Sequence, residues 1–168
     1  MFRKMRRNPI QMLCQDENIE ILKKATSGVL SVFDGEYPYG VPLSYTMVGD
    51  KLYFHSAKKG HKIEAIENNA NASFTVIETD DIVGAELTTY FRSVIVFGKV
   101  RILEGDDEKK AALMALADKY CKGYEEKASA EADELMKAVN VLVFDIEHIS
   151  GKEAIEFARE RHPEKSDK

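Results

Sequence analysis

Two strand-like segments joined by a two-residue turn limit the fold of this chain more than any other feature. The segments cover about residues 40–48 and 51–55, and Gly49-Asp50 between them is a typical hairpin sequence. A polar, basic turn follows His55 at once, and a helical pattern begins at about Gly60. We therefore expect an antiparallel pair of strands with a helix leaving the end of the second strand.

The rest of the chain extends this pattern into a sheet with helices around it. Further strands are predicted at residues 29–33, 72–78, 90–103 and 139–147, which makes six, and residues 80–88 are expected to be irregular. Helices are predicted at residues 16–27, 60–68, 106–121, 129–138 and 152–161, with Asp16 and Ser150 as candidate N-caps. Gly98, inside the longest strand, predicts a bulge or a sharp bend, and Pro42 predicts an edge strand or a bulge. The strands lack a regular βαβ alternation, which favours an antiparallel barrel with helices packed outside it.

The length of 168 residues predicts one domain, at residues 16–161, with an N-terminal arm at 1–15 and a disordered tail at 162–168. The net charge is −5, and residues 3–7 are the one strongly basic segment. No basic or aromatic surface extends that segment, so we expect a solvated arm or an arm that reaches a partner subunit, and no nucleic-acid binding.

The two cysteines, Cys14 and Cys121, lack CxxC spacing, and no signal sequence or membrane-spanning apolar run is found. These features predict a cytoplasmic protein with inert thiols and no membrane partner. An acidic group at residues 78–81 has no accompanying histidine, so we interpret it as a solvated loop and expect no metal.

A group of polar and basic side chains surrounds the start of the helix predicted at residues 60–68. His55, Ser56, His61 and Lys62 all lie within eight residues of one another. The free N–H groups and the positive dipole end of a helix attract phosphate, and a lysine in the first turn is unfavourable without an anion. The segment therefore predicts a site for a phosphorylated cofactor. The alternatives are a strand-end His55 bonded to a backbone carbonyl, a solvated Lys62 and a capping role for Ser56.

Four segments in order carry a resemblance to a known family. They are residues 37–45 (YPYGVPLSY), 52–62 (LYFHSAKKGHK), 90–100 (YFRSVIVFGKV) and 149–154 (ISGKEA). With them, residues 5–156 resemble the FMN-binding split barrel of the pyridoxamine 5′-phosphate oxidase-like superfamily, and in particular its nitroimidazole-resistance (nitroimidazole reductase) branch. The resemblance implies a mainly β, α+β fold, a six-stranded antiparallel Greek-key split β-barrel with flanking helices.

The resemblance also implies which residues hold the cofactor. The flavin ring is expected against the strand of Val41, Pro42, Leu43, Ser44 and Tyr45. His55 and Ser56 match positions on the ribityl-phosphate side, and His61 and Lys62 match the phosphate clamp, where oxidase members usually carry arginine in place of His61. Arg92 and Ser93 match positions that approach the cofactor, although Arg92 is also a candidate ion-pair partner of Glu86 or Asp81.

The predicted function is that of an FMN-dependent oxidoreductase, similar to a nitroreductase, which passes electrons from reduced flavin to a small, flat acceptor. In the nitroimidazole-resistance branch a functional histidine occupies the position of His55, so His55 is the predicted catalytic residue. The resemblance implies a homodimer with flavin at the subunit interface. A non-catalytic protein that stores or senses flavin or haem is the alternative, and F420 is a further candidate cofactor.

Overall fold

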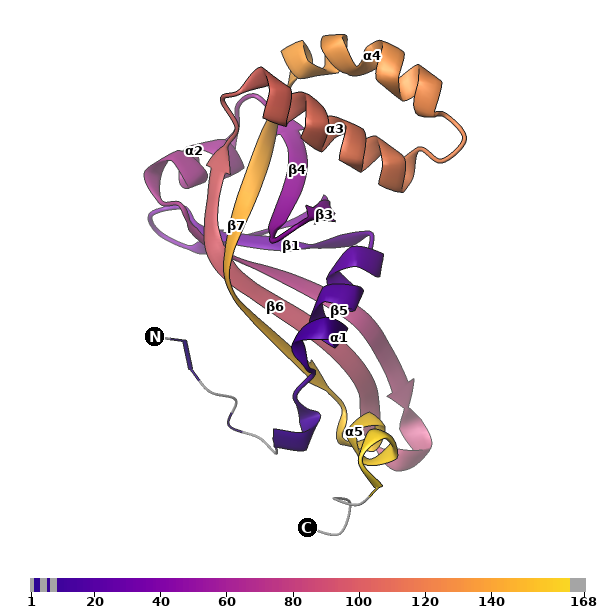
Figure 1. Ribbon diagram of the computed structural model, residues 1–168. Helices are drawn as coiled ribbons and strands as arrows, with labels where there is room; N and C mark the ends of the chain where they lie inside the picture. The colour runs from indigo at the N-terminus through magenta and orange to yellow at the C-terminus, as the bar shows by residue number, and fades with distance from the viewer. Residues whose placement is uncertain (1, 4–5, 7–8, 164–168) are drawn as a thin grey trace.

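One curled antiparallel sheet dominates the computed structural model, which describes residues 2–3, 6 and 9–163 (Figure 1). The strands are β1 (Ser27–Phe33), β2 (Pro38–Ser44), β3 (Thr46–Val48), β4 (Lys51–Ala57), β5 (Asn71–Val83), β6 (Thr88–Ile102) and β7 (Val139–Glu153). They are ordered β2-β1-β5-β6-β7-β4-β3 in the sheet. The predicted split barrel is confirmed, with seven strands in the described part of the chain rather than the predicted six.

The seventh strand arises because the predicted strand at residues 40–48 is divided at Tyr45. Its first part, β2, pairs with β1, and its second part, β3, pairs with β4. These two strands are the opposite edges of the sheet, yet a single residue connects them. Because consecutive Cα atoms are only 3.8 Å apart, the sheet has to curl until its two edges meet at this point.

Tyr45 is fixed at this junction by its ring, its hydroxyl and its backbone. The side chain is fully buried, and its ring packs edge-on against Phe74 with centroids 4.7 Å apart. Its hydroxyl donates a hydrogen bond of 2.6 Å to the carbonyl of Leu22, while its backbone N–H donates to the Tyr120 hydroxyl at 3.0 Å. Residues from two helices therefore hold the point where the barrel closes.

The helices pack on both faces of the curled sheet. They are α1 (Gln15–Lys24), α2 (His61–Asn68), α3 (Asp106–Tyr120), α4 (Glu125–Ala138) and α5 (Ile155–Arg161), with 3₁₀ turns η1 (Pro9–Gln11) and η2 (Gly84–Glu86). Apolar side chains of α1 and α2 complete the main core inside the barrel. The hairpin of α3 and α4 lies beside β4 and β7, at the top of Figure 1, where α3 contributes to a second, smaller core. Among the helices described, none is long and apolar enough to cross a membrane.

Several local predictions are confirmed by the backbone. Val48 pairs with Lys51 across a two-residue turn in which Gly49 has a φ of +62°. The pairing of β6 with β7 shifts register at Gly98, where a Cβ atom would lie 2.1 Å from the Asp145 carbonyl oxygen. Only glycine allows the β7 backbone to come so close, so the absence of a side chain at Gly98 explains why the bulge lies here. Pro42 lies on β2, an edge strand as predicted.

Several local predictions are wrong. The predicted N-cap Asp16 lies inside α1, whose N-cap is Cys14, and α4 begins at Glu125 rather than at residue 129. The last helix begins at Ile155 rather than at residue 152, because β7 continues to Glu153 in register with β6, and Ser150 lies inside this strand. Residues 80–83 belong to β5 and are not irregular, since pairing with β6 continues past a bulge to Val83. In both strands, pairing with β6 continues the strand through residues that lack an alternation of apolar and polar side chains.

Residues 11–13 pack against the end of β7. The Gln11 side chain donates a 3.0 Å hydrogen bond to the backbone carbonyl of Glu153, and Leu13 is buried. Part of the predicted arm at residues 1–15 therefore contributes to the core. Residues 1, 4–5 and 7–8 of this arm, and 164–168 of the predicted tail, lie outside the described residues.

We expect Tyr45→Phe to lower the free energy of unfolding by about 1–3 kcal/mol, because the buried carbonyl of Leu22 loses its hydrogen-bond donor. Urea denaturation followed by circular dichroism measures the change. The control is Tyr37→Phe, since the Tyr37 side chain is 64% exposed and its hydroxyl can bond to water. Equal stability of Tyr45→Phe and wild type would show that this bond does not fix the junction.

Candidate functional site

An apolar cavity lies between the α3–α4 hairpin and the ends of β2, β4 and β7. Its volume is about 390 Å³, within the usual range for sites that bind small molecules. We call it the His55 pocket; the residues that line it are Ser44, His55, Leu113, Met114, Leu116, Ala117, Tyr120, Cys121, Ala128, Leu135 and Val139. His55 forms no hydrogen bond with another described residue, so its ring nitrogens are available to a bound molecule.

Ser56 points away from this pocket, because neighbouring residues of a strand face opposite sides of the sheet. It lies on the same side of β4 as Leu52 and Phe54, which belong to the main core. Its side chain is buried and its Oγ has no hydrogen-bond partner in the described structure. A buried hydroxyl without a partner costs free energy, so Ser56 carries an unsatisfied hydrogen-bonding group on the core side of β4.

The turn from β4 into α2 brings His61 against Asp34 of the β1–β2 connection and Tyr39 of β2. His61 Nε2 lies 3.0 Å from Asp34 Oδ2, and the imidazole stacks on the Tyr39 ring with centroids 4.3 Å apart. Hydrogen bonds from the backbone N–H groups of Tyr37 and Glu36 hold the pKa of Asp34 below its usual range. Asp34 is therefore ionised at neutral pH. Its carboxylate already pairs with Nε2 of His61, so this nitrogen of the predicted phosphate clamp is not free for a phosphate.

Lys62 lies in the first turn of α2. It is half-buried, and no carboxylate of the described residues lies within ion-pair distance of its ammonium group. Burial lowers the pKa of Lys62 below its usual value. A nearby anion would offset this cost, and the first two N–H groups of α2 point in the direction from which an anion approaches.

The predicted flavin-facing strand alternates between the sheet's two faces. On β2, Val41 and Leu43 are half-buried, whereas Pro42 and Ser44 are exposed, and Ser44 reaches the His55 pocket. Tyr45 differs from them because its side chain is buried in the core and its backbone binds Tyr120. This strand therefore brings Ser44 and His55 together, while the Tyr45 ring faces the interior.

Residues 15–153 match the family model described as pyridoxamine 5′-phosphate oxidase. This match covers most of the chain. The chain belongs to the pyridoxamine 5′-phosphate oxidase family. The comparison with curated protein sequences gave no significant match.

Solved structures with the same fold agree with the family assignment. A Bacteroides thetaiotaomicron protein, proposed to act in 5-nitroimidazole antibiotic resistance, is 26% identical with a TM-score of 0.70, over 84% of this chain and 85% of that one. An FAD-binding protein from Mesorhizobium loti is 24% identical with a TM-score of 0.65, over 85% and 96%. The FAD and haem binding protein from Mycobacterium smegmatis is 21% identical with a TM-score of 0.75, over 86% and 73%. The predicted superfamily is confirmed, and the first of these structures supports the predicted branch.

Two residues that the family resemblance assigns to the cofactor lie far from α2 within one chain. Arg92 pairs with Glu153 across β6 and β7, whereas Ser56 pairs with Asn140 at the other end of β7. At about 3.3 Å per residue these positions on β7 are roughly 40 Å apart along the strand. Ser93 faces the opposite side of β6 from Arg92, as alternation along the strand requires. A single chain therefore does not bring Arg92 and Lys62 to one small ligand.

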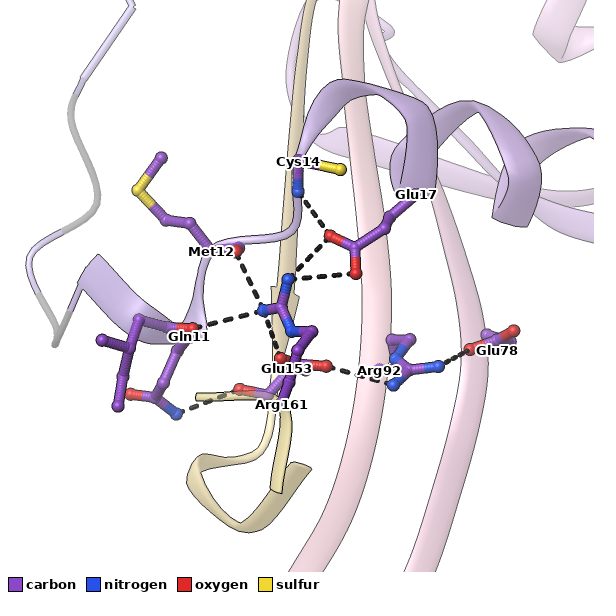
Figure 2. Close-up of polar contacts among 9 residues, drawn as sticks. Gln11, Met12, Cys14, Glu17, Glu78, Arg92, Glu153 and Arg161 are labelled. Atoms are coloured by element: carbon purple, nitrogen blue, oxygen red, sulfur yellow. Dashed lines mark hydrogen bonds and ion pairs between the residues drawn. The ribbon is translucent and has the colours of Figure 1, made fainter. Parts of the chain in front are cut away.

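Arg92 belongs instead to an ion-pair network at the end of the sheet, shown in Figure 2. Its guanidinium lies 3.1 Å from the Glu153 carboxylate and 3.4 Å from that of Glu78. The sequence-based candidates for its partner, Glu86 and Asp81, are therefore wrong, because the bulge in β5 brings Glu78 beside Arg92.

Glu153 is fully buried and is the centre of this network. A second guanidinium, from Arg161 of α5, also binds its carboxylate and lies 2.9 Å from Glu17 of α1. The NH2 group of Arg161 also donates to the carbonyl of Met12 at 3.2 Å (Figure 2). The network therefore connects Met12 and Arg161 to the sheet, which gives Arg92 a structural role.

The prediction of site residues missed the contribution of α3 and α4. The apolar spacing of Leu113, Leu116 and Tyr120 indicates a helix face that packs against the rest of the protein. Only the position of the hairpin in the structure shows that these residues line a cavity. Asp34 was missed because a turn aspartate gives no sign of a partner 27 positions later. The assignment of the eleven candidate residues to a cofactor site stays a prediction.

We expect Glu153→Ala to lower the free energy of unfolding by about 3–5 kcal/mol, because two guanidinium groups lose the buried carboxylate between them. Urea denaturation measures this loss. Glu160→Ala, on the exposed side of α5, is the control and is expected to change stability by less than about 0.5 kcal/mol. Similar stabilities for the two variants would contradict a central role for Glu153.

Proposed function

We propose that this protein binds FMN and acts as an oxidoreductase that passes electrons from the reduced flavin to a small, flat acceptor. The observation that carries the proposal is Lys62 in the first turn of α2, a half-buried cation that has no partner among the described residues. A dianionic phosphate at this place would meet the Lys62 ammonium and the free N–H groups of the helix. Family membership supports the proposal, and the fold is shared with proteins described as FAD-binding.

The buried hydroxyl of Ser56 is a further group that fits a polar cofactor. His61 fits less well than the arginine usual in the oxidases, since Asp34 already holds it and adds a negative charge. The phosphate therefore depends mainly on Lys62 and the helix. The flavin ring would lie against the backbone of an edge strand, at Val41, Pro42, Leu43 and Ser44. Tyr45, which is buried in the core, would hold the end of this strand in place.

The flavin would supply the redox chemistry, and the protein would bind and orient the reactants. His55 lines the apolar pocket and would orient the acceptor or donate a proton to it. We infer that His55→Ala slows acceptor reduction while leaving the flavin bound. A flavin- or haem-binding protein without turnover is the alternative, and a visible spectrum of the purified protein with donor added distinguishes the two.

We further propose a homodimer, which rests on the outer face of the sheet. Cross-strand pairing places Val29, Thr75 and Ile95 in one row on the face opposite the core, and Phe97 follows two residues after Ile95. Among these apolar side chains, exposure is 37% for Val29, 38% for Ile95 and 36% for Phe97. A contiguous apolar surface of this kind is suited to a second copy of the chain. Such a copy could bring its own Ser93, on the same face as Ile95, toward a flavin at the interface.

Lys62→Met is expected to weaken FMN binding by about 10- to 150-fold, the equivalent of losing a charge-assisted hydrogen bond of roughly 1.5–3 kcal/mol. Because burial already disfavours the charged form of Lys62, the variant without ligand is expected to unfold at the same temperature as wild type or higher. Fluorescence titration of FMN and a thermal melt measure the two quantities. Lys59→Met, exposed in the same turn, is the matched control. Unchanged FMN affinity in Lys62→Met would remove this lysine from the site.

Ile95→Asp is expected to convert the dimer into a monomer, since a carboxylate would be buried without a partner at the interface. Sedimentation velocity measures the mass. The control is Ile82→Asp, because Ile82 is 85% exposed near the tip of the β5–β6 hairpin. A wild-type protein that sediments as a monomer at micromolar concentration would contradict the homodimer.

A further inference from the structure

The walls of the His55 pocket carry no fixed charge. Its eleven lining residues include no lysine, arginine, aspartate or glutamate. Three lysines adjoin lining residues in the sequence, Lys119, Lys122 and Lys127, and none of the three lines the pocket. The Lys119 ammonium is held elsewhere: it donates a 2.5 Å hydrogen bond to the Ala25 carbonyl and lies over the Tyr45 ring. An anionic molecule would therefore lose its hydration in this pocket without gaining a counter-ion.

The polar groups of the pocket are mostly engaged within the protein. The Tyr120 hydroxyl accepts a hydrogen bond from the Tyr45 N–H and lies 2.6 Å from the Tyr45 carbonyl oxygen. Burial raises the pKa of the Tyr120 hydroxyl, and its hydrogen bonds with the Tyr45 backbone and the Ser44 side chain oppose this effect only in part. His55 is left as the lining group with open ring nitrogens. The pocket thus offers a ligand apolar contact and one directional hydrogen-bonding group.

We propose that the α3–α4 hairpin determines substrate choice: it makes the His55 pocket a site for neutral aromatic molecules of one or two rings and excludes carboxylates and phosphate esters. The proposal rests on the proposed function in taking this pocket as the acceptor site. The specificity-determining positions are Ala117 on α3, which limits the volume, and Leu135 on α4, which is 42% exposed and keeps the wall apolar. By the same reasoning, pyridoxamine 5′-phosphate is excluded from this pocket.

The test compares nitrobenzene with 4-nitrobenzoate, which differ by one carboxylate. Saturation-transfer NMR titrations on the purified protein, with and without added FMN, measure both affinities. Nitrobenzene is expected to bind at least about tenfold more tightly. Ala117→Trp, which fills the cavity, is expected to remove this binding, whereas Ala130→Trp on the exposed surface of α4 leaves it unchanged.

A second pair of variants tests the wall charge directly. Leu135→Arg places a cation at the partly exposed edge of the pocket and is expected to raise the affinity for 4-nitrobenzoate about tenfold, while Leu135→Gln changes only polarity and leaves the preference for nitrobenzene. Equal affinities of wild type for the two compounds, or nitrobenzene binding that survives Ala117→Trp in a folded protein, would overturn the proposal.

The two proposals fail in different ways. FMN binding is measured separately by fluorescence. If the protein binds no FMN but still prefers nitrobenzene, and Ala117→Trp removes this preference, the flavin proposal is refuted and the selectivity of the pocket is supported. The opposite result is a protein that binds FMN and reduces the two compounds at equal rates, both in wild type and in Leu135→Arg. That result would refute the selectivity and leave the flavin proposal standing.

Discussion

The junction at Tyr45 is the constraint on which the rest of this structure depends. One residue connects two strands that are the opposite edges of the sheet, so the sheet cannot stay open at this point. The buried Tyr45 ring fills the core below the junction, and Tyr120 of α3 binds its backbone. This contact also sets where the α3–α4 hairpin lies. The His55 pocket, lined by Ser44 just before the junction and by Tyr120, is a direct consequence.

Two neighbouring regions of the molecule differ in their electrostatics. The start of α2 offers Lys62 and free helix N–H groups, with His61 already paired to Asp34. The His55 pocket, on the other side of β4, is apolar and uncharged. Because His55 and Ser56 are adjacent in β4 but face opposite sides, this one strand separates the two environments. This arrangement suits a molecule whose charged end lies at the start of α2 and whose flat aromatic end lies in the His55 pocket. It also suits a charged cofactor beside a neutral reactant.

Local signals in the sequence were sufficient for much of the fold. The Gly49 turn and the bulge at Gly98 follow from the backbone freedom of glycine, and the edge position of β2 follows from Pro42. The division of residues 40–48 at Tyr45 could not be predicted, because the apolar alternation continues through it and only tertiary packing bends the chain there. The length of β7 was underestimated for a similar reason, since Gly151 and Glu153 pair with β6 without an apolar pattern.

Within the candidate site, contacts between neighbours in the sequence were predictable, and contacts between distant residues were not. The position of Lys62 in the first turn of α2 follows from its neighbours along the chain. The pairing of His61 with Asp34, and of Arg92 with a fully buried Glu153, joins residues whose proximity only the folded sheet creates. Ion pairs between residues far apart in the chain leave no periodic signal in a single sequence, because each partner alone resembles a solvated surface residue.

The most direct test of the account is the affinity of the purified protein for FMN compared with riboflavin, measured by fluorescence titration in one buffer. The two ligands share the ring and the ribityl chain and differ only in the phosphate, which is the group we assign to Lys62 and the start of α2. The account predicts that FMN binds at least about tenfold more tightly, the equivalent of 1.4 kcal/mol or more. Equal affinities, or no binding of either compound, would contradict it.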